Sequence, residues 1–121
     1  MEKVMGIGGL FFRSNDPAKL AKWYEELLGI SPVPTDYDTP AWKQSGGDTV
    51  FAPFDQDTEM FGSPEQQWMI NFRVSDLNAM CRQLESAGVA VQQEGDFPNG
   101  RFARLTDPEG NPIQLWEPSD Q

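Results

Sequence analysis

The stretch "LTDPEGNPIQLWEP", residues 105–118, decides how the fold of this 121-residue chain is interpreted. Its centre, "DPEGN" at residues 107–111, consists of residue types that favour tight turns. Residues 101–106 before the turn and 112–116 after it have the apolar and polar alternation of strands. The stretch therefore predicts two strands joined by a turn near the end of the chain.

The strand after this turn has two different faces. Side chains alternate along a strand, so Ile113 and Leu115 point to one side and Gln114 and Trp116 to the other. We expect Ile113 and Leu115 to face helices, and Gln114 and Trp116 to face a cavity. Glu117 falls at the strand end on the helix-facing side. We therefore interpret it as a solvated strand-end residue and not as a metal ligand.

Two segments of the chain match at an offset of 60 residues. They are "GLFFRSNDPAKLAKWYEELLGI", residues 9–30, and "MINFRVSDLNAMCRQLESAGV", residues 69–89. Each copy has period-two alternation and then a helical pattern, which predicts a strand followed by a helix. The aligned pairs include Phe12 and Phe72, Arg13 and Arg73, and Asp16 and Asp76.

Both predicted helices have signals at their ends. An aspartate precedes each helix and suits the N-cap, and Pro17 suits the first helical position. A glycine follows each helix and suits the left-handed residue at which helices commonly end. The predicted helices run from Asp16 to about Leu28 and from Asp76 to about Ala87, and the glycines are Gly29 and Gly88.

Three further strand candidates follow each helix. We predict an α+β fold of two tandem βαβββ modules, residues 1–54 and 67–118, joined by a connection at residues 55–66 within one domain. The modules would form a curved, mostly antiparallel eight-stranded sheet, a cup with helices outside. The strand candidates are residues 31–34, 41–44 and 49–53 in the first module and 89–93, 101–106 and 112–116 in the second.

The composition excludes several classes of function. Asp and Glu number 19 against 9 Lys and Arg, and this charge of -10 argues against a nucleic-acid partner. The chain has no histidine, the commonest general base and transition-metal ligand. Cys81 is the single cysteine, so no intramolecular disulfide is possible. Without a membrane-length apolar run or a signal-peptide pattern, we expect a cytoplasmic protein with no membrane partner.

The repeated strand-Asp-helix start and the closing "RLTDPEGNPIQLWEP" resemble the vicinal oxygen chelate superfamily. This superfamily includes glyoxalases, extradiol dioxygenases, fosfomycin-resistance enzymes and bleomycin-resistance proteins. The most specific piece is the "DPEGN" turn followed by an alternating strand, and the matching motifs span nearly the whole chain. The resemblance implies the fold but says little about activity, because the scaffold hosts several unrelated functions.

The resemblance also implies a metal at the centre of the cup, held by the first and last strands of each module. The corresponding positions here are Gly9, Met69, Gln114 and Phe51, or Val50 if the register differs by one residue. A glycine and an apolar residue offer no donor, and a thioether is a soft, weak one. Gln114 is a neutral amide. We therefore predict a member without the metal, with no cofactor and no catalytic residues.

The alternation of the strands predicts which side chains face the cup. They combine aromatic walls with amide and guanidinium donors, which suits a flat organic ligand that carries a carboxylate, phenolate or carbonyl. The alternative is that the aromatic residues pack only on one another or on a second subunit. The candidate ligand-binding residues are Phe11, Arg13, Phe51, Met69, Asn71, Arg73, Phe102, Arg104, Gln114 and Trp116.

Three hypotheses for function follow from these features. The first is a metal-independent, small-molecule-binding protein of the glyoxalase or bleomycin-resistance type, with an aromatic or anionic organic ligand in the cup. The second is a metal-dependent, glyoxalase- or dioxygenase-like enzyme, which would require a different strand register. The third is a ligand-free dimerisation or regulatory module. Because two modules in a short chain leave sheet edges open, we also expect a homodimer.

Overall fold

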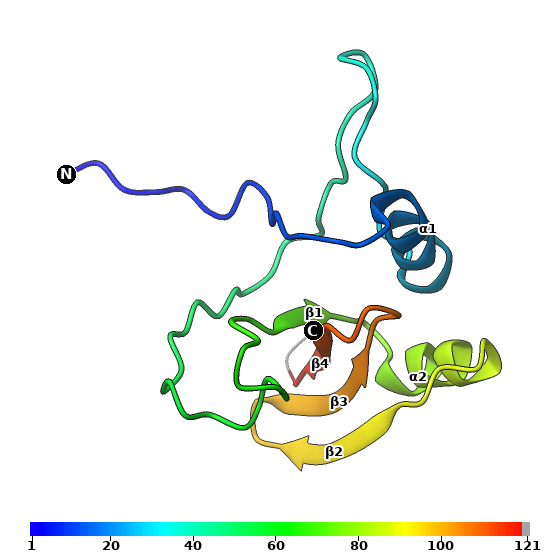
Figure 1. The fold of residues 1–121 in the computed structure, drawn as a ribbon. Coiled ribbons are helices and arrows are strands. Elements are labelled where there is room, and N and C mark those ends of the chain that lie inside the picture. The colour runs from blue at the N-terminus through cyan, green and yellow to red at the C-terminus, as the bar shows by residue number, and fades with distance from the viewer. Residues whose placement is uncertain (120–121) are drawn as a thin grey trace.

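The computed structural model of the protein describes residues 1–119, and Figure 1 shows its ribbon. It contains a four-stranded sheet in the order β1-β4-β3-β2. Strand β1 pairs parallel with β4, whereas the other two pairs are antiparallel. The elements in chain order are α1 (Pro17–Leu28), β1 (Ile70–Arg73), α2 (Leu77–Ser86), β2 (Gln92–Phe97), β3 (Gly100–Thr106) and β4 (Pro112–Pro118).

The second half of the chain folds as a βαβββ unit, in agreement with the α+β class. Helix α2 begins after Asp76, whose side chain accepts a 3.0 Å hydrogen bond from the backbone N–H of Ala79. The predicted turn joins β3 to β4, where Thr106 lies opposite Pro112 and the backbone N–H of Asp107 donates to the carbonyl oxygen of Asn111. The turn residues therefore set the register of this strand pair.

Strand β2 lies further along the chain than the sequence predicts. It spans Gln92–Phe97 instead of residues 89–93. Its register with β3 shifts between Gln93 and Gly95, which marks a bulge. A bulge inserts one extra residue and turns the strand locally. Glu94 occupies this bulge, one residue beyond the end of the predicted strand.

The hydrophobic core lies between the two helices and one face of the sheet. Both helices contribute buried side chains to it, and Ile113 and Leu115 of β4 are fully buried against them, as their alternation predicts. No helix within residues 1–119 has the length and apolar character needed to cross a membrane. The buried hydrophobic residues are Leu20, Tyr24, Leu77, Cys81, Leu84, Ala103, Leu105, Ile113 and Leu115.

Helix α1 is held against the turn between β3 and β4. The Tyr24 hydroxyl donates a 2.7 Å hydrogen bond to the buried carboxylate of Asp107. The carboxylate of Glu109 accepts hydrogen bonds from the Ser14 hydroxyl at 2.6 Å and from the backbone N–H of Asn15 at 2.8 Å. The residues of the turn thus attach the first half of the chain to the second.

Glu117 has a role that the sequence prediction missed. Its carboxylate accepts a 2.8 Å hydrogen bond from the backbone N–H of Leu77, the first residue of α2. A carboxylate is favourable at a helix N-terminus because the first N–H groups lack partners within the helix. The interpretation of Glu117 as a merely solvated residue was therefore wrong. It contributes to the start of α2 in the way that Glu109 does near α1.

The predicted strands of the first half are not formed in the described residues. Figure 1 shows the N-terminal segment leading away from the sheet, and the chain after α1 extending beyond that helix before it returns toward the sheet. Phe11 and Phe51, both predicted to face the cup, are 94% and 85% exposed. A strand needs a hydrogen-bonded neighbour, and these segments pair with none among residues 1–119. The structure thus shows four strands where the sequence predicts eight.

Candidate ligand-binding site

The open face of the sheet, opposite the core, carries polar and aromatic side chains. Phe102 of β3 lies opposite Trp116 of β4, and Arg104 lies opposite Gln114. Asn71 of β1 is the other neighbour of Gln114. Residues paired across neighbouring strands share a face. The register therefore brings together side chains from three strands that are far apart in the sequence.

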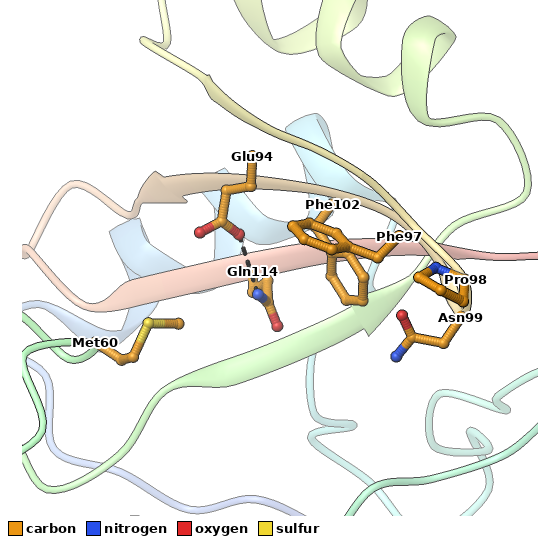
Figure 2. Close-up of a pocket in the computed structure, with 7 residues that line it drawn as sticks. All are labelled: Met60, Glu94, Phe97, Pro98, Asn99, Phe102 and Gln114. Carbon is orange, nitrogen blue, oxygen red and sulfur yellow. Dashed lines mark hydrogen bonds between the residues drawn. The ribbon is translucent and has the colours of Figure 1, made fainter.

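A pocket of about 460 Å³ opens on this face. Its size is within the range of small-molecule sites, about 300–1,000 Å³. Figure 2 shows its wall, to which strands β2, β3 and β4, the β2–β3 hairpin and the segment before β1 contribute. The lining residues are Met60, Glu94, Phe97, Pro98, Asn99, Phe102 and Gln114.

A chain of polar contacts crosses the open face. Asn71 Nδ2 donates to Gln114 Oε1 at 2.8 Å, and Gln114 Nε2 donates to Glu94 Oε1 at 3.0 Å. The second oxygen of Glu94 lies 3.9 Å from Arg104 Nε. Arg104 in turn donates to the carbonyl oxygen of Met60. Both ends of the Gln114 amide are engaged, so its orientation is fixed by its neighbours.

An aromatic wall stands beside this polar chain. The rings of Phe97 and Phe102 meet edge to face, with centroids 5.9 Å apart. The rings of Phe102 and Trp116 are parallel within 2°, with centroids 6.2 Å apart. Trp116 Nε1 donates a 2.9 Å hydrogen bond to the carbonyl oxygen of Asn99. This bond fixes the indole, and the wall therefore presents ring surfaces in a defined orientation.

Most of the candidate ligand-binding residues touch this surface, although few line the pocket itself. Phe102 and Gln114 are pocket-lining residues. The Met69 sulfur lies 3.7 Å from Arg104 Nη2, which places both beside the polar chain. The candidates that the structure brings together are Met69, Asn71, Phe102, Arg104, Gln114 and Trp116.

Arg73 is a candidate whose side chain is engaged elsewhere. Its guanidinium donates to the carbonyl oxygens of Ser45, at 2.9 Å, and Asp48. The side chain runs so close to Gly47 that an added Cβ there would lie 2.6 Å from Arg73 Nε. Arg73 therefore holds a first-half loop near the sheet, and the pocket does not include it.

Three candidates from the first half lie outside the pocket. Phe11, Arg13 and Phe51 are exposed and do not line it. Their placement in the cup depended on first-half strands, which have no sheet neighbour in the described chain. In this single chain they do not line one pocket with the second-half residues, and their place in the cup stays a prediction.

Glu94 is the main pocket residue that the sequence prediction missed. The predicted strand ended at residue 93, so Glu94 was left outside it. The alternation in "VQQEGDF", residues 91–97, carries a signal, because Gln92 pairs with Arg104 of the open face and Glu94 follows two residues later. Met60 lies in an irregular connection and has no comparable pattern.

The residues at the predicted metal positions do not fit a metal. Gly9 has no side-chain donor, and Phe51 is apolar and exposed. Met69 offers a thioether, and the Gln114 amide already bonds to Asn71 and Glu94. Within residues 1–119, no group of three or more His, Cys, Asp and Glu side chains could hold a metal ion. The donor set thus differs from the one that the superfamily resemblance implies.

Known proteins of similar sequence and structure agree with this fold. The chain is 34% identical over 99 residues to the anthracycline biosynthesis protein DnrV of Streptomyces peucetius. This match covers 78% of the chain but only 35% of that longer relative. TnmS3, an antibiotic binding protein from Streptomyces sp. CB03234, is 29% identical with a TM-score of 0.59, over 87% of this chain and 88% of that one.

A third protein shares the fold alone. It is a glyoxylase/bleomycin resistance protein/dioxygenase domain from Frankia sp. EAN1pec, 18% identical with a TM-score of 0.60, over 96% of this chain and 99% of that one. Residues 9–116 match the glyoxalase-like domain family, a segment that includes both copies of the repeat and every pocket-lining residue. The chain therefore belongs to the glyoxalase-like domain family of the vicinal oxygen chelate superfamily.

Proposed function

We propose that this protein binds a planar aromatic small molecule in the pocket on the open face of the sheet, without a metal ion. The observation that carries the proposal is the aromatic wall of Phe97, Phe102 and Trp116 beside a fixed polar chain. Apolar walls with a few precisely placed polar groups are the usual composition of small-molecule sites. The ring surfaces can stack on a flat ligand, and the polar chain can orient its substituents.

The relatives support this class of ligand. TnmS3 is described as an antibiotic binding protein and matches most of the chain. DnrV is described as an anthracycline biosynthesis protein, and anthracyclines contain a fused-ring aromatic system. Both descriptions are compatible with a pocket that accepts a flat, multi-ring molecule. We therefore favour an anthraquinone as the first probe.

Binding can be tested by quenching of tryptophan fluorescence with a dihydroxyanthraquinone. We expect saturable binding to the wild-type protein. Removal of the central ring in Phe102→Ala should weaken it about tenfold or more, because a buried aromatic side chain contributes about 1.5–3 kcal/mol. Tyr37→Ala removes an exposed ring that does not line the pocket and should leave binding unchanged. If wild-type protein binds no anthraquinone, the proposed function is wrong.

Metal independence needs its own measurement. Elemental analysis of the purified protein should find less than stoichiometric divalent metal, and treatment with a chelator should leave probe binding unchanged. The expectation rests on the donors at Gly9, Phe51, Met69 and Gln114, which suit divalent cations poorly. If the protein holds stoichiometric metal and its removal abolishes probe binding, metal independence is wrong and the second hypothesis, a metal-dependent enzyme, is favoured.

The proposal includes a homodimer that completes the cup. The first half exposes large apolar side chains, among them Leu10, Phe11, Val50 and Phe51, and extensive apolar exposure marks interaction surfaces. Pairing with a second copy would let the modules at residues 1–54 and 67–118 form the eight-stranded sheet. Phe11, Arg13 and Phe51 would then join the site. Light scattering should find a dimer, and a monomer at high protein concentration would contradict this part.

A further inference from the structure

The pocket contains a carboxylate, and its surroundings indicate which ligands it accepts. Glu94 lines the pocket from the bulge of β2, and its side chain is 22% exposed. Figure 2 shows its carboxyl group directed toward Gln114, beside the rings of Phe97 and Phe102. A charge in this half-buried position requires polar partners. The state of each carboxylate oxygen therefore determines what Glu94 can bind.

One oxygen of Glu94 is engaged and the other can accept a hydrogen bond. Oε1 accepts from Gln114 Nε2 at 3.0 Å. Oε2 lies 3.9 Å from Arg104 Nε, well beyond the length of a charge-assisted hydrogen bond, about 2.7–2.9 Å. Among residues 1–119, no hydrogen bond reaches Oε2. Its lone pairs are thus available to a donor on a ligand.

The donors near Glu94 either bond to protein atoms or face Glu94 itself. Arg104, a candidate for binding an anionic ligand, donates from Nη2 to the Met60 carbonyl oxygen, and its Nε faces Glu94 Oε2 at 3.9 Å, so its positive charge is balanced by that carboxylate. The Gln114 amide donates to Glu94 and accepts from Asn71. The polar chain therefore offers an acceptor to a ligand more readily than a donor.

We infer that Glu94 determines the specificity of this pocket by selecting aromatic ligands with a hydroxyl or amine donor over those with a carboxylate. The inference rests on the proposed function and deepens it. A ligand donor completes the hydrogen bonding of Oε2, whereas a ligand carboxylate in the same place meets a like charge. The net charge of -10 acts in the same direction by repelling anions.

The test compares three probes that share one ring system. They are a dihydroxyanthraquinone, an aminomethyl anthraquinone and an anthraquinone carboxylate, each titrated against tryptophan fluorescence. Wild-type protein should bind the hydroxyl and amine probes about tenfold or more tightly than the carboxylate, the size expected for one charge-assisted hydrogen bond. Glu94→Gln removes the charge at nearly constant shape and should lose most of this preference.

Two further variants make the comparison specific. Glu94→Asp keeps the charge and should keep part of the preference for the hydroxyl and amine probes. If circular dichroism shows that Glu94→Gln is unfolded, the probe preference of Glu94→Asp is the test of the inference, and an unchanged preference would contradict it. Asp96→Asn is the matched control, because Asp96 lies on the same strand but is exposed, pairs with Arg101 and does not line the pocket. It should bind the three probes as the wild-type protein does.

The outcomes separate the inference from the proposed function. If the wild-type protein binds none of the probes, the proposed function fails and the inference fails with it. If the probes bind but Glu94→Gln leaves their order unchanged, or the carboxylate probe binds most tightly, only the inference fails. If Asp96→Asn loses the preference as much as Glu94→Gln does, the net charge and not Glu94 determines the selection, and the inference is wrong.

Discussion

Replacement of Tyr24 by phenylalanine should lower the free energy of unfolding by about 1.5–2 kcal/mol. The Tyr24 hydroxyl donates a 2.7 Å hydrogen bond to the carboxylate of Asp107, which is 4% exposed. A hydrogen bond to a charged group contributes about 1.5–3 kcal/mol to stability. Asp107 keeps its hydrogen bonds from Asn111 Nδ2 and from the backbone N–H of Glu109, so the loss should be at the lower end. The ring itself remains, so its edge contact with Phe72 persists.

Unfolding in urea measures this loss. With a slope of about 2 kcal/mol per molar urea, the transition midpoint of Tyr24→Phe should fall by about 1 M. Tyr37→Phe removes the same hydroxyl from a fully exposed tyrosine and should leave the midpoint unchanged. An equal midpoint for Tyr24→Phe and wild-type protein, or an equal decrease in both variants, would refute the assignment of this stability to the bond with Asp107.

The remaining predictions concern pH and backbone conformation. Burial, reinforced by a carboxylate partner, raises the pKa of Tyr24. The neutral phenol therefore stabilises the fold fully at pH values below the ordinary pKa of about 10. As the pH rises above about 10, the urea midpoint of the wild-type protein should fall, and that of Tyr24→Phe should fall less. Hydrogen bonds from the Ser14 hydroxyl and nearby backbone N–H groups lower the pKa of Glu109. The Glu109 carboxylate therefore stabilises the fold fully above the ordinary pKa of about 4.3, and this stabilisation is lost as the pH falls through the lowered pKa. The protection factors of the α1 amides, corrected for the intrinsic pH dependence of exchange, should fall there, and Glu109→Gln should remove that decrease. Gly100→Ala should destabilise by more than about 1 kcal/mol, because φ is 139° and an added Cβ would lie 2.3 Å from a backbone oxygen of β4. Gly46→Ala meets no atom within 4 Å and is the control.

Sequence reasoning predicted the helices of this fold because their signals are local. Asp16 and Asp76 accept the N-cap hydrogen bonds, and Gly29 has the left-handed φ of 71° that ends α1. Strands β3 and β4 were also predicted, since a tight turn places them next to each other. The three first-half strands between residues 31 and 53 were not found, because strand formation depends on a partner that local patterns cannot supply.

The same distinction explains the candidate site. Alternation along well-defined strands placed Phe102 and Gln114 on the open face, where both line the pocket. Glu94 was missed because the predicted strand ended at residue 93, although the alternation continues from Gln92 to Glu94. Met60 belongs to an irregular segment, where no periodic pattern predicts the direction in which a side chain points. Phe51 was placed by a strand that the described residues do not form.

The side chains of residues 105–118 contact different parts of the molecule on the two faces of the sheet. Asp107, Glu109 and Glu117 bind the helices, whereas Gln114 points to the pocket. The superfamily resemblance implies a metal ligand at position 114, and here Glu94 Oε1 lies 3.0 Å from the Gln114 amide nitrogen. An acid in that place would face Glu94 as a like charge and would need a cation between them. An amide instead donates to one oxygen of Glu94, and the proposed ligand donates to the other. Gln114 and Glu94 are therefore matched to each other, as the proposed ligand-binding pocket requires.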